Sequence, residues 1–179
     1  MKIAVISDAS PLIYFARMNK LEFLAQVVGT VAIPPAVYQE TVEAGRRRRK
    51  PANRIAKAIE EQIIVRLALT AQEIQLTSTL NADPRLGTGE CEVIACAARR
   101  SLKTLLHDKK PRGVAAAYNV RTMQAADVLF LALLHRHVSL NEFKTLLRDL
   151  AALIGMNAAT LLEREALAEE IATQLNLQE

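Results

Sequence analysis

Short apolar runs alternate with helical patterns along most of the chain, and this alternation constrains the fold more than any other feature. The runs lie at residues 3–6, 30–33, 63–65, 104–106 and 120–122. Continuous apolar runs are typical of parallel strands buried on both faces, and strands that alternate with helices favour a sheet covered by helices. The sequence therefore predicts an α/β fold, a three-layer αβα sandwich around a central parallel sheet of about five strands.

Residues that favour helix starts occur in the segments between and after these runs. Pro35 suits the first turn of a helix, and Thr70 with Glu73 forms a capping box. Ser139 opens a second capping box before the helix expected at residues 140–154, and a last helix follows it. We expect one domain over residues 1–137 and, over residues 138–179, a C-terminal helical extension packed on that domain or on a partner.

The composition favours a folded protein without a membrane span. Apolar residues make up 51% of the 179 residues, so the chain can bury a sizeable core, and no apolar run is long enough for a membrane span. The first residues do not resemble a signal peptide. Cys91 and Cys96 lack disulfide or zinc spacing, so we interpret them as packing residues in a cytoplasmic protein. The net charge of +4 weakly favours a polyanionic partner.

Four acidic residues fall just after expected strands or at helix starts, on one side of the expected sheet. They are Asp8, Glu40, Glu90 and Asp108. In open α/β sheets, ligands bind beyond the carboxyl ends of the strands, and oxygen ligands suit hard cations. Each acid alone could instead cap a helix or interact favourably with the dipole at a helix N-terminus. Four of them in matched places predict a shared site.

Neighbouring acids had to be separated by their helix faces. Glu90 and Glu92 lie about 200° apart on a helix, so they cannot face one site. Glu90 shares a face with apolar residues and is the candidate for the site, whereas we expect Glu92 to face solvent. We favour Glu40 over Glu43 because it lies closer to the helix start.

Four ordered motifs resemble those of PIN domains. They are residues 8–13 (DASPLI), 33–40 (IPPAVYQE), 89–95 (GECEVIA) and 105–112 (LLHDKKPR). The resemblance spans residues 2–134 and is specific through order and spacing. It is greatest to the PIN-like nucleic-acid-binding branch related to VapC-type toxins. His107 departs from that branch, where a second Asp is usual, and Pro111 stands where Ala is common.

The resemblance implies a ribonuclease that uses Mg²⁺ or Mn²⁺ held by an acidic quartet. By position these acids are Asp8, Glu40, Glu90 and Asp108, with Ser10 assisting. The chemistry agrees, because hydrolysis of a phosphodiester needs an activated water and a stabilised leaving oxygen, and such ions supply both. The resemblance also implies the toxin of a toxin–antitoxin pair, with an antitoxin protein as partner. We further expect a homo-oligomer.

Basic residues offer contacts for single-stranded or structured RNA. Lys109, Lys110 and Arg112 adjoin Asp108 and could hold a phosphate. The run Arg46, Arg47, Arg48, Arg49 and Lys50 could grip the backbone through charge, although such a run can also be a solvated loop. His107, His135 and His137 lack zinc partners, so we interpret them as non-ligands.

Other functions of an α/β fold need residues that this sequence lacks at the corresponding positions, with one exception. Dehalogenase-type phosphatases need a second Asp where Ser10 stands, and receiver domains need a phospho-acceptor Asp where Arg66 and Leu67 stand. Both classes are disfavoured. A non-catalytic RNA-binding or protein-interaction module on the same fold stays open, because His107 leaves one fewer carboxylate.

Overall fold

The computed structural model describes residues 2–44 and 50–176. Its sheet has five parallel strands in the order β3-β2-β1-β4-β5. The strands are β1 (Ile3–Ser7), β2 (Thr30–Ile33), β3 (Ile64–Arg66), β4 (Lys103–Leu105) and β5 (Thr122–Met123). The predicted α/β sandwich around a parallel sheet of about five strands is confirmed.

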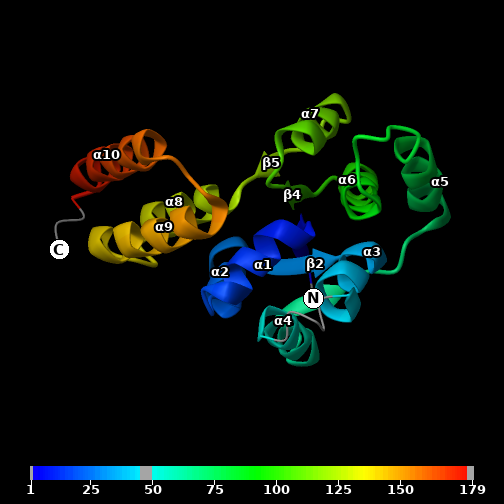
Figure 1. Ribbon diagram of the computed structural model, residues 1–179, viewed down its shortest axis with the longest axis horizontal. Helices are drawn as coiled ribbons and strands as arrows, with labels where there is room; N and C mark the ends of the chain where they lie inside the picture. Colours follow the sequence, from blue (N-terminus) through cyan, green and yellow to red (C-terminus); the bar gives the residue numbers. More distant parts are fainter. Residues whose placement is uncertain (1, 45–49, 177–179) are drawn as a thin grey trace. The chain divides into compact units, whose positions relative to one another are not determined.

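Helices cover the sheet in two layers (Figure 1). One layer contains α1 (Ala9–Arg17), α2 (Leu21–Val28) and α4 (Lys50–Glu60), and the other contains α5 (Ala71–Leu80), α6 (Thr88–Arg100) and α7 (Lys109–Ala117). Right-handed crossovers explain the division, because the chain moves outward from β1 to β3 and then returns past β1 to β4 and β5. The short α3 (Pro35–Tyr38) continues into η1, a π-helix over Gln39–Glu43.

The core lies between these layers and the strands. Ile6 and Ile33 on the strands, Phe15 on α1 and Ile94 on α6 are fully buried or nearly so. Burial on both faces explains why the strands are continuous apolar runs in the sequence. A left-handed Gly29, at φ 84°, ends α2 and turns the chain into β2.

By its internal contacts the chain divides into two units, residues 1–124 and 125–179. The second unit contains α8 (Ala125–Leu134), α9 (Leu140–Ile154) and α10 (Ala158–Gln174). The predicted cap at Ser139 is present, Asn157 caps the last helix, and Phe130 packs on Phe143 with ring centroids 4.9 Å apart. Contacts therefore group α8 with the two helices after it, whereas the boundary that we expected after His137 stays a prediction.

Ion pairs join the last two helices. Arg148 contacts Glu165 at 2.7 Å, and Lys144 contacts Glu169. Among the helices that the structure describes, none is long and apolar enough to cross a membrane.

Candidate functional site

At the carboxyl edge, between β1 and β4, the strand order reverses: successive strands are added on one side of β1 and then on the other. β1 is joined to β2 on one side, whereas β4 enters on its other side by a crossover from β3. Ligands of open α/β sheets bind at such a reversal, where the flanking connections leave a crevice. Asp8 follows β1 directly, and Asp108 follows β4 after a short turn. Two of the predicted acids therefore flank the reversal.

Asp8 is the most buried of the predicted acids. It occupies the N-cap position of α1, its side chain makes no hydrogen bond of capping geometry, and the residue is 7% exposed. Its backbone N–H donates to the Leu105 carbonyl of β4 at 3.0 Å. Its pKa is raised to about 6, chiefly by burial and also by the charges of Glu90 and Glu40, although the nearby N–H groups of Ala9 and Ser10 oppose the rise. The site thus holds Asp8 where its charged form is costly without a cation.

Glu40 lies on the π-helix η1, a rare form of helix that occurs often at functional sites. Its carboxylate lies against Gly89 at the start of α6. A Cβ atom built on Gly89 would be 2.8 Å from Glu40 Oε1, so only glycine leaves room for this carboxylate. Partial burial raises the Glu40 pKa, the Gly89 N–H lowers it, and the charge of Glu90 raises it again. The glycine is therefore part of the site, which the sequence did not reveal.

Glu90 lies in the first turn of α6, where we expected it. Its carboxylate accepts a hydrogen bond from the Gly87 N–H at 2.8 Å, so it also caps its own helix. Partial burial raises its pKa, the Gly87 N–H lowers it, and the charge of Asp108 raises it. Asp108 itself is exposed at the N-cap of α7.

A series of pairwise electrostatic interactions links the four predicted acids. Asp8 is coupled to Glu90 and Glu40, Glu40 to Glu90, and Glu90 to Asp108. Within residues 2–44 and 50–176, however, no three His, Cys, Asp or Glu side chains meet at a spacing that would hold a metal ion. By chemical type, the four carboxylates are the oxygen ligands that a hard cation such as Mg²⁺ or Mn²⁺ prefers.

The expectation for Glu92 was wrong. Glu92 is 8% exposed, and its carboxylate accepts a hydrogen bond from the Ala36 N–H at 2.7 Å. It thereby satisfies a free backbone donor at the start of α3 and couples α6 to the segment that carries Glu40. Helix faces separate Glu90 from Glu92 correctly, but α3 packs against the face that we had assigned to solvent.

Tyr14 is a further side chain at this edge, and the sequence reading missed it. Its ring meets His107 edge-on, with centroids 5.2 Å apart. Burial and the charges of Asp108 and Asp8 raise its pKa, while a hydrogen bond with the Ser10 side chain lowers it. Ser10 and Tyr14 are one helical turn apart on α1, which is the signal that could have identified the pair. His107 thus packs as an aromatic ring at the position of the missing acid.

The predicted cations beside Asp108 surround the start of α7. Lys109 and Lys110 are exposed, and Arg112 is half-buried. The Nε of Arg112 is buried and has no hydrogen-bond partner in the part of the chain that the structure describes. Lys50 is exposed at the start of α4, whereas Arg46, Arg47, Arg48 and Arg49 lie outside the described residues.

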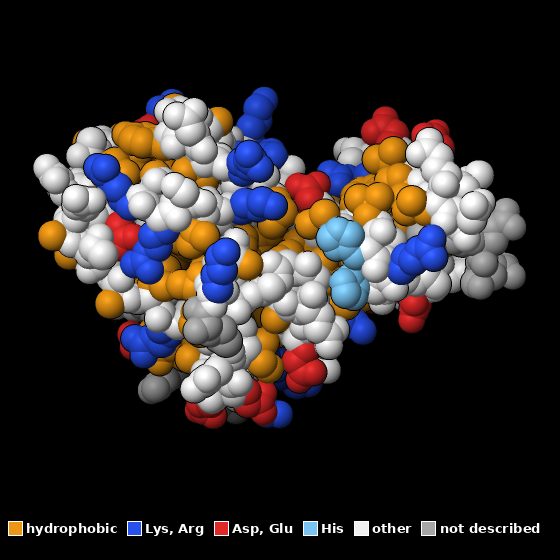
Figure 2. Space-filling view, turned by 180° about the vertical axis from the view of Figure 1, so that it is seen from behind, with side chains coloured by type: hydrophobic (Ala, Val, Ile, Leu, Met, Phe, Trp, Pro, Cys, Tyr) orange, Lys and Arg blue, Asp and Glu red, His pale blue; other side chains and the backbone are white. Residues whose placement is uncertain are grey.

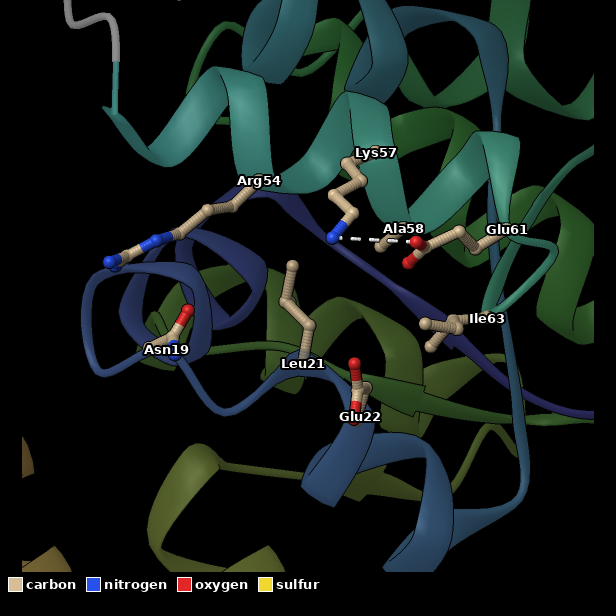
Figure 3. Close-up of a pocket in the computed structure, with 8 residues that line it drawn as sticks. All are labelled: Asn19, Leu21, Glu22, Arg54, Lys57, Ala58, Glu61 and Ile63. Carbon is tan, nitrogen blue, oxygen red and sulfur yellow. Dashed lines mark ion pairs between the residues drawn. The ribbon is translucent and has the colours of Figure 1, made fainter.

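Two pockets lie at the opposite edge of the sheet. One, of about 160 Å³, is lined by Asn19, Glu22, Arg54 and Lys57 among others (Figure 3). In it Lys57 pairs with Glu61 at 3.4 Å, and Arg54 is engaged by the Ala16 and Arg17 carbonyls. The other opens beside Gly29 and Ile63, which precede β2 and β3. Both pockets are therefore remote from the acids at the carboxyl edge.

A family model covers most of the chain. Residues 4–177 match the family described as DUF3368, PIN domain. No curated protein matches the chain. The matched region contains all four acids and the helices that follow the sheet.

Proposed function

Because this chain belongs to the PIN-domain family, whose members are generally nucleases, we propose that it is a metal-dependent ribonuclease that hydrolyses RNA phosphodiester bonds. Asp8, Glu40, Glu90 and Asp108 would hold Mg²⁺ or Mn²⁺. The observation that carries the proposal is that these acids interact electrostatically at the carboxyl edge, where burial and these charges raise the pKa of three of them. Carboxylates that repel each other in the free protein are stabilised when a divalent cation binds.

The position of each residue indicates its proposed role in hydrolysis. A bound divalent ion would generate the attacking hydroxide and stabilise the leaving oxygen. Asp8, fixed between β1 and β4, anchors the cation site, and Glu90 and Glu40 complete it from α6 and η1. Tyr14 hydrogen-bonds the Ser10 side chain and interacts electrostatically with Asp8, so the two hydroxyls would orient a water or a phosphate oxygen by hydrogen bonds.

The charge distribution favours a nucleic-acid substrate. Residues 1–124 carry 19 of the 23 Lys and Arg residues but only 11 of the 19 Asp and Glu residues. Lys and Arg side chains are distributed over the visible face of this unit (Figure 2). Lys109, Lys110 and Arg112 would hold the phosphate beside the acids, and the run from Arg46 to Lys50 would add affinity through counterion release.

Other parts of the proposal do not depend on the acids. The family resemblance supports the role of a toxin with an antitoxin partner, and the spacing of Cys91 and Cys96 supports a cytoplasmic location. We further propose homo-oligomerisation and packing of the helical extension over residues 138–179 on the sheet domain or on a partner. The non-catalytic RNA-binding or protein-interaction module remains the second candidate, favoured by His107 in place of a carboxylate and by its packing on Tyr14.

Turnover of mixed RNA with and without Mn²⁺ tests the proposal. The wild-type protein should cleave only with the metal, and Asp8→Asn and Glu90→Gln should each abolish cleavage. Asp149→Asn on α9, which removes an exposed carboxylate from the second unit, should cleave as the wild type does. RNA binding without turnover under all metal conditions would instead support the non-catalytic module.

A further inference from the structure

A stacked Arg–Tyr pair lies at the carboxyl edge of the sheet, on the side away from Asp108. Arg66 is the last residue of β3, and its guanidinium carbon lies 3.6 Å from the centroid of the Tyr38 ring at the end of α3. β3 is the edge strand next to β2, and Ile33 at the end of β2 is the register partner of Arg66. The pair therefore belongs to the same edge as the acids.

The guanidinium of Arg66 is held in place and yet available to a ligand. The residue is exposed, and the guanidinium makes no hydrogen bond or ion pair with any residue that the structure describes. Stacking on an aromatic ring fixes the plane of a guanidinium, so less conformational freedom is lost when its N–H groups bind. Arg54 and Arg100, in contrast, are engaged by backbone carbonyls or by a carboxylate. Arg66 is thus an oriented donor with its hydrogen-bonding edge unused.

The strand order sets the distance from Arg66 to the other cations. From β3 to β4 there are three strand spacings, about 14 Å in all at 4.7–4.9 Å each. The ends of β2 and β1, with Glu40 and Asp8 after them, lie between. A single strand of a few nucleotides can span this width, with Lys109 and Lys110 on one side of the acids and Arg66 on the other.

We propose that Arg66, oriented by Tyr38, binds a phosphate of single-stranded RNA that crosses the carboxyl edge from the β4 side to the β3 side. This proposal rests on the proposed ribonuclease function for its substrate, and it adds the direction in which the strand runs across the sheet and a positioning residue remote from the bond that is cut. A planar guanidinium presents two parallel N–H groups to a phosphate, which an ammonium cannot do.

The test measures binding of a labelled 12-nucleotide single-stranded RNA of mixed sequence to the full chain in EDTA, where no cleavage occurs. Arg66→Gln should weaken binding about tenfold at low salt and should lower the slope of log Kd against log salt by about 0.7, the value for one phosphate contact on a single strand. Arg66→Lys keeps the charge and the fold, but it should still bind less tightly than the wild type. Tyr38→Phe should bind normally, and Tyr38→Leu should bind less tightly.

Arg99→Gln is the matched control, because Arg99 is exposed near the far end of α6, close to where β4 begins at the amino edge. Its affinity and salt slope should equal those of the wild type. Wild-type affinity in Arg66→Gln or Arg66→Lys, or an equal loss in Arg99→Gln, would overturn the proposal. Cleavage by the wild-type protein with Mn²⁺ is read separately. If the wild-type protein does not cleave RNA while Arg66→Gln still weakens RNA binding, the proposed nuclease function is refuted and the proposed RNA-binding site is supported.

Discussion

Asp8→Asn should stabilise the metal-free protein, and the gain should grow with pH. Burial, with a smaller contribution from the charges of Glu90 and Glu40, raises the Asp8 pKa from 3.8 to about 6. A folded-state pKa above the unfolded value means that the fold favours the neutral acid, so stability is lost as pH rises between the two values. A rise of about two units corresponds to roughly 3 kcal/mol once Asp8 is fully ionised. Asparagine carries no charge and escapes this cost.

Denaturant unfolding of both proteins in EDTA at pH 4, 6 and 8 measures the effect. The free energy of unfolding of Asp8→Asn minus that of the wild type should increase by about 2–3 kcal/mol from pH 4 to pH 8, with unchanged m-values. Asp149→Asn should show no such increase, because Asp149 is exposed on α9. A difference that stays constant with pH would refute the claim that burial and neighbouring acids destabilise charged Asp8.

A divalent ion should reverse the order of stability. An ion that binds the folded site alone stabilises the wild type by about 2.7 kcal/mol at 100 times its Kd, whereas Asp8→Asn should lose most of this gain. NaCl at matched ionic strength should have little effect on either protein. A wild-type stability that does not change up to millimolar Mn²⁺ would count against the metal site.

Three further substitutions have defined outcomes. Gly89→Ala should leave the free energy of unfolding unchanged or raise it by up to about 1 kcal/mol, because Gly is a poor helix residue, yet it should reduce RNA turnover by displacing the Glu40 carboxylate. Arg100→Met should lower the free energy of unfolding by about 3 kcal/mol, since it leaves the fully buried Glu73 carboxylate without its ion-pair partner; a loss below 1 kcal/mol would contradict this. Ser139→Ala should cost about 1 kcal/mol in thermal or denaturant unfolding by removing the α9 cap.

Helix and strand positions were predictable because they depend on local chemistry. The caps at Thr70 and Ser139 lie where the sequence placed them. α7 begins at Lys109, because Asp108 has the extended conformation of an N-cap. The segment that carries Glu40 became a π-helix, for which the sequence has no distinct signal.

Contacts between side chains from distant parts of the chain could not be predicted from the sequence. Tyr14 meets His107, Arg66 stacks on Tyr38, and Glu92 binds the Ala36 N–H, although none of these partners is near the other in the chain. Each pair forms because two strand ends or helix starts arrive at one edge. Periodicity gives the face of a helix but does not give what packs against that face.

The sequence by itself determined that Asp8, Glu40, Glu90 and Asp108 lie at strand ends and helix starts, because a buried parallel strand and the helix after it are recognisable from a dozen residues. Only the tertiary structure decided that these acids come to one edge of the sheet and perturb each other's ionisation. The physical reason is the order of the strands. The crossover from β3 places β4 beside β1 rather than at the far edge, and burial between the two helical layers then sets the cost of each charge.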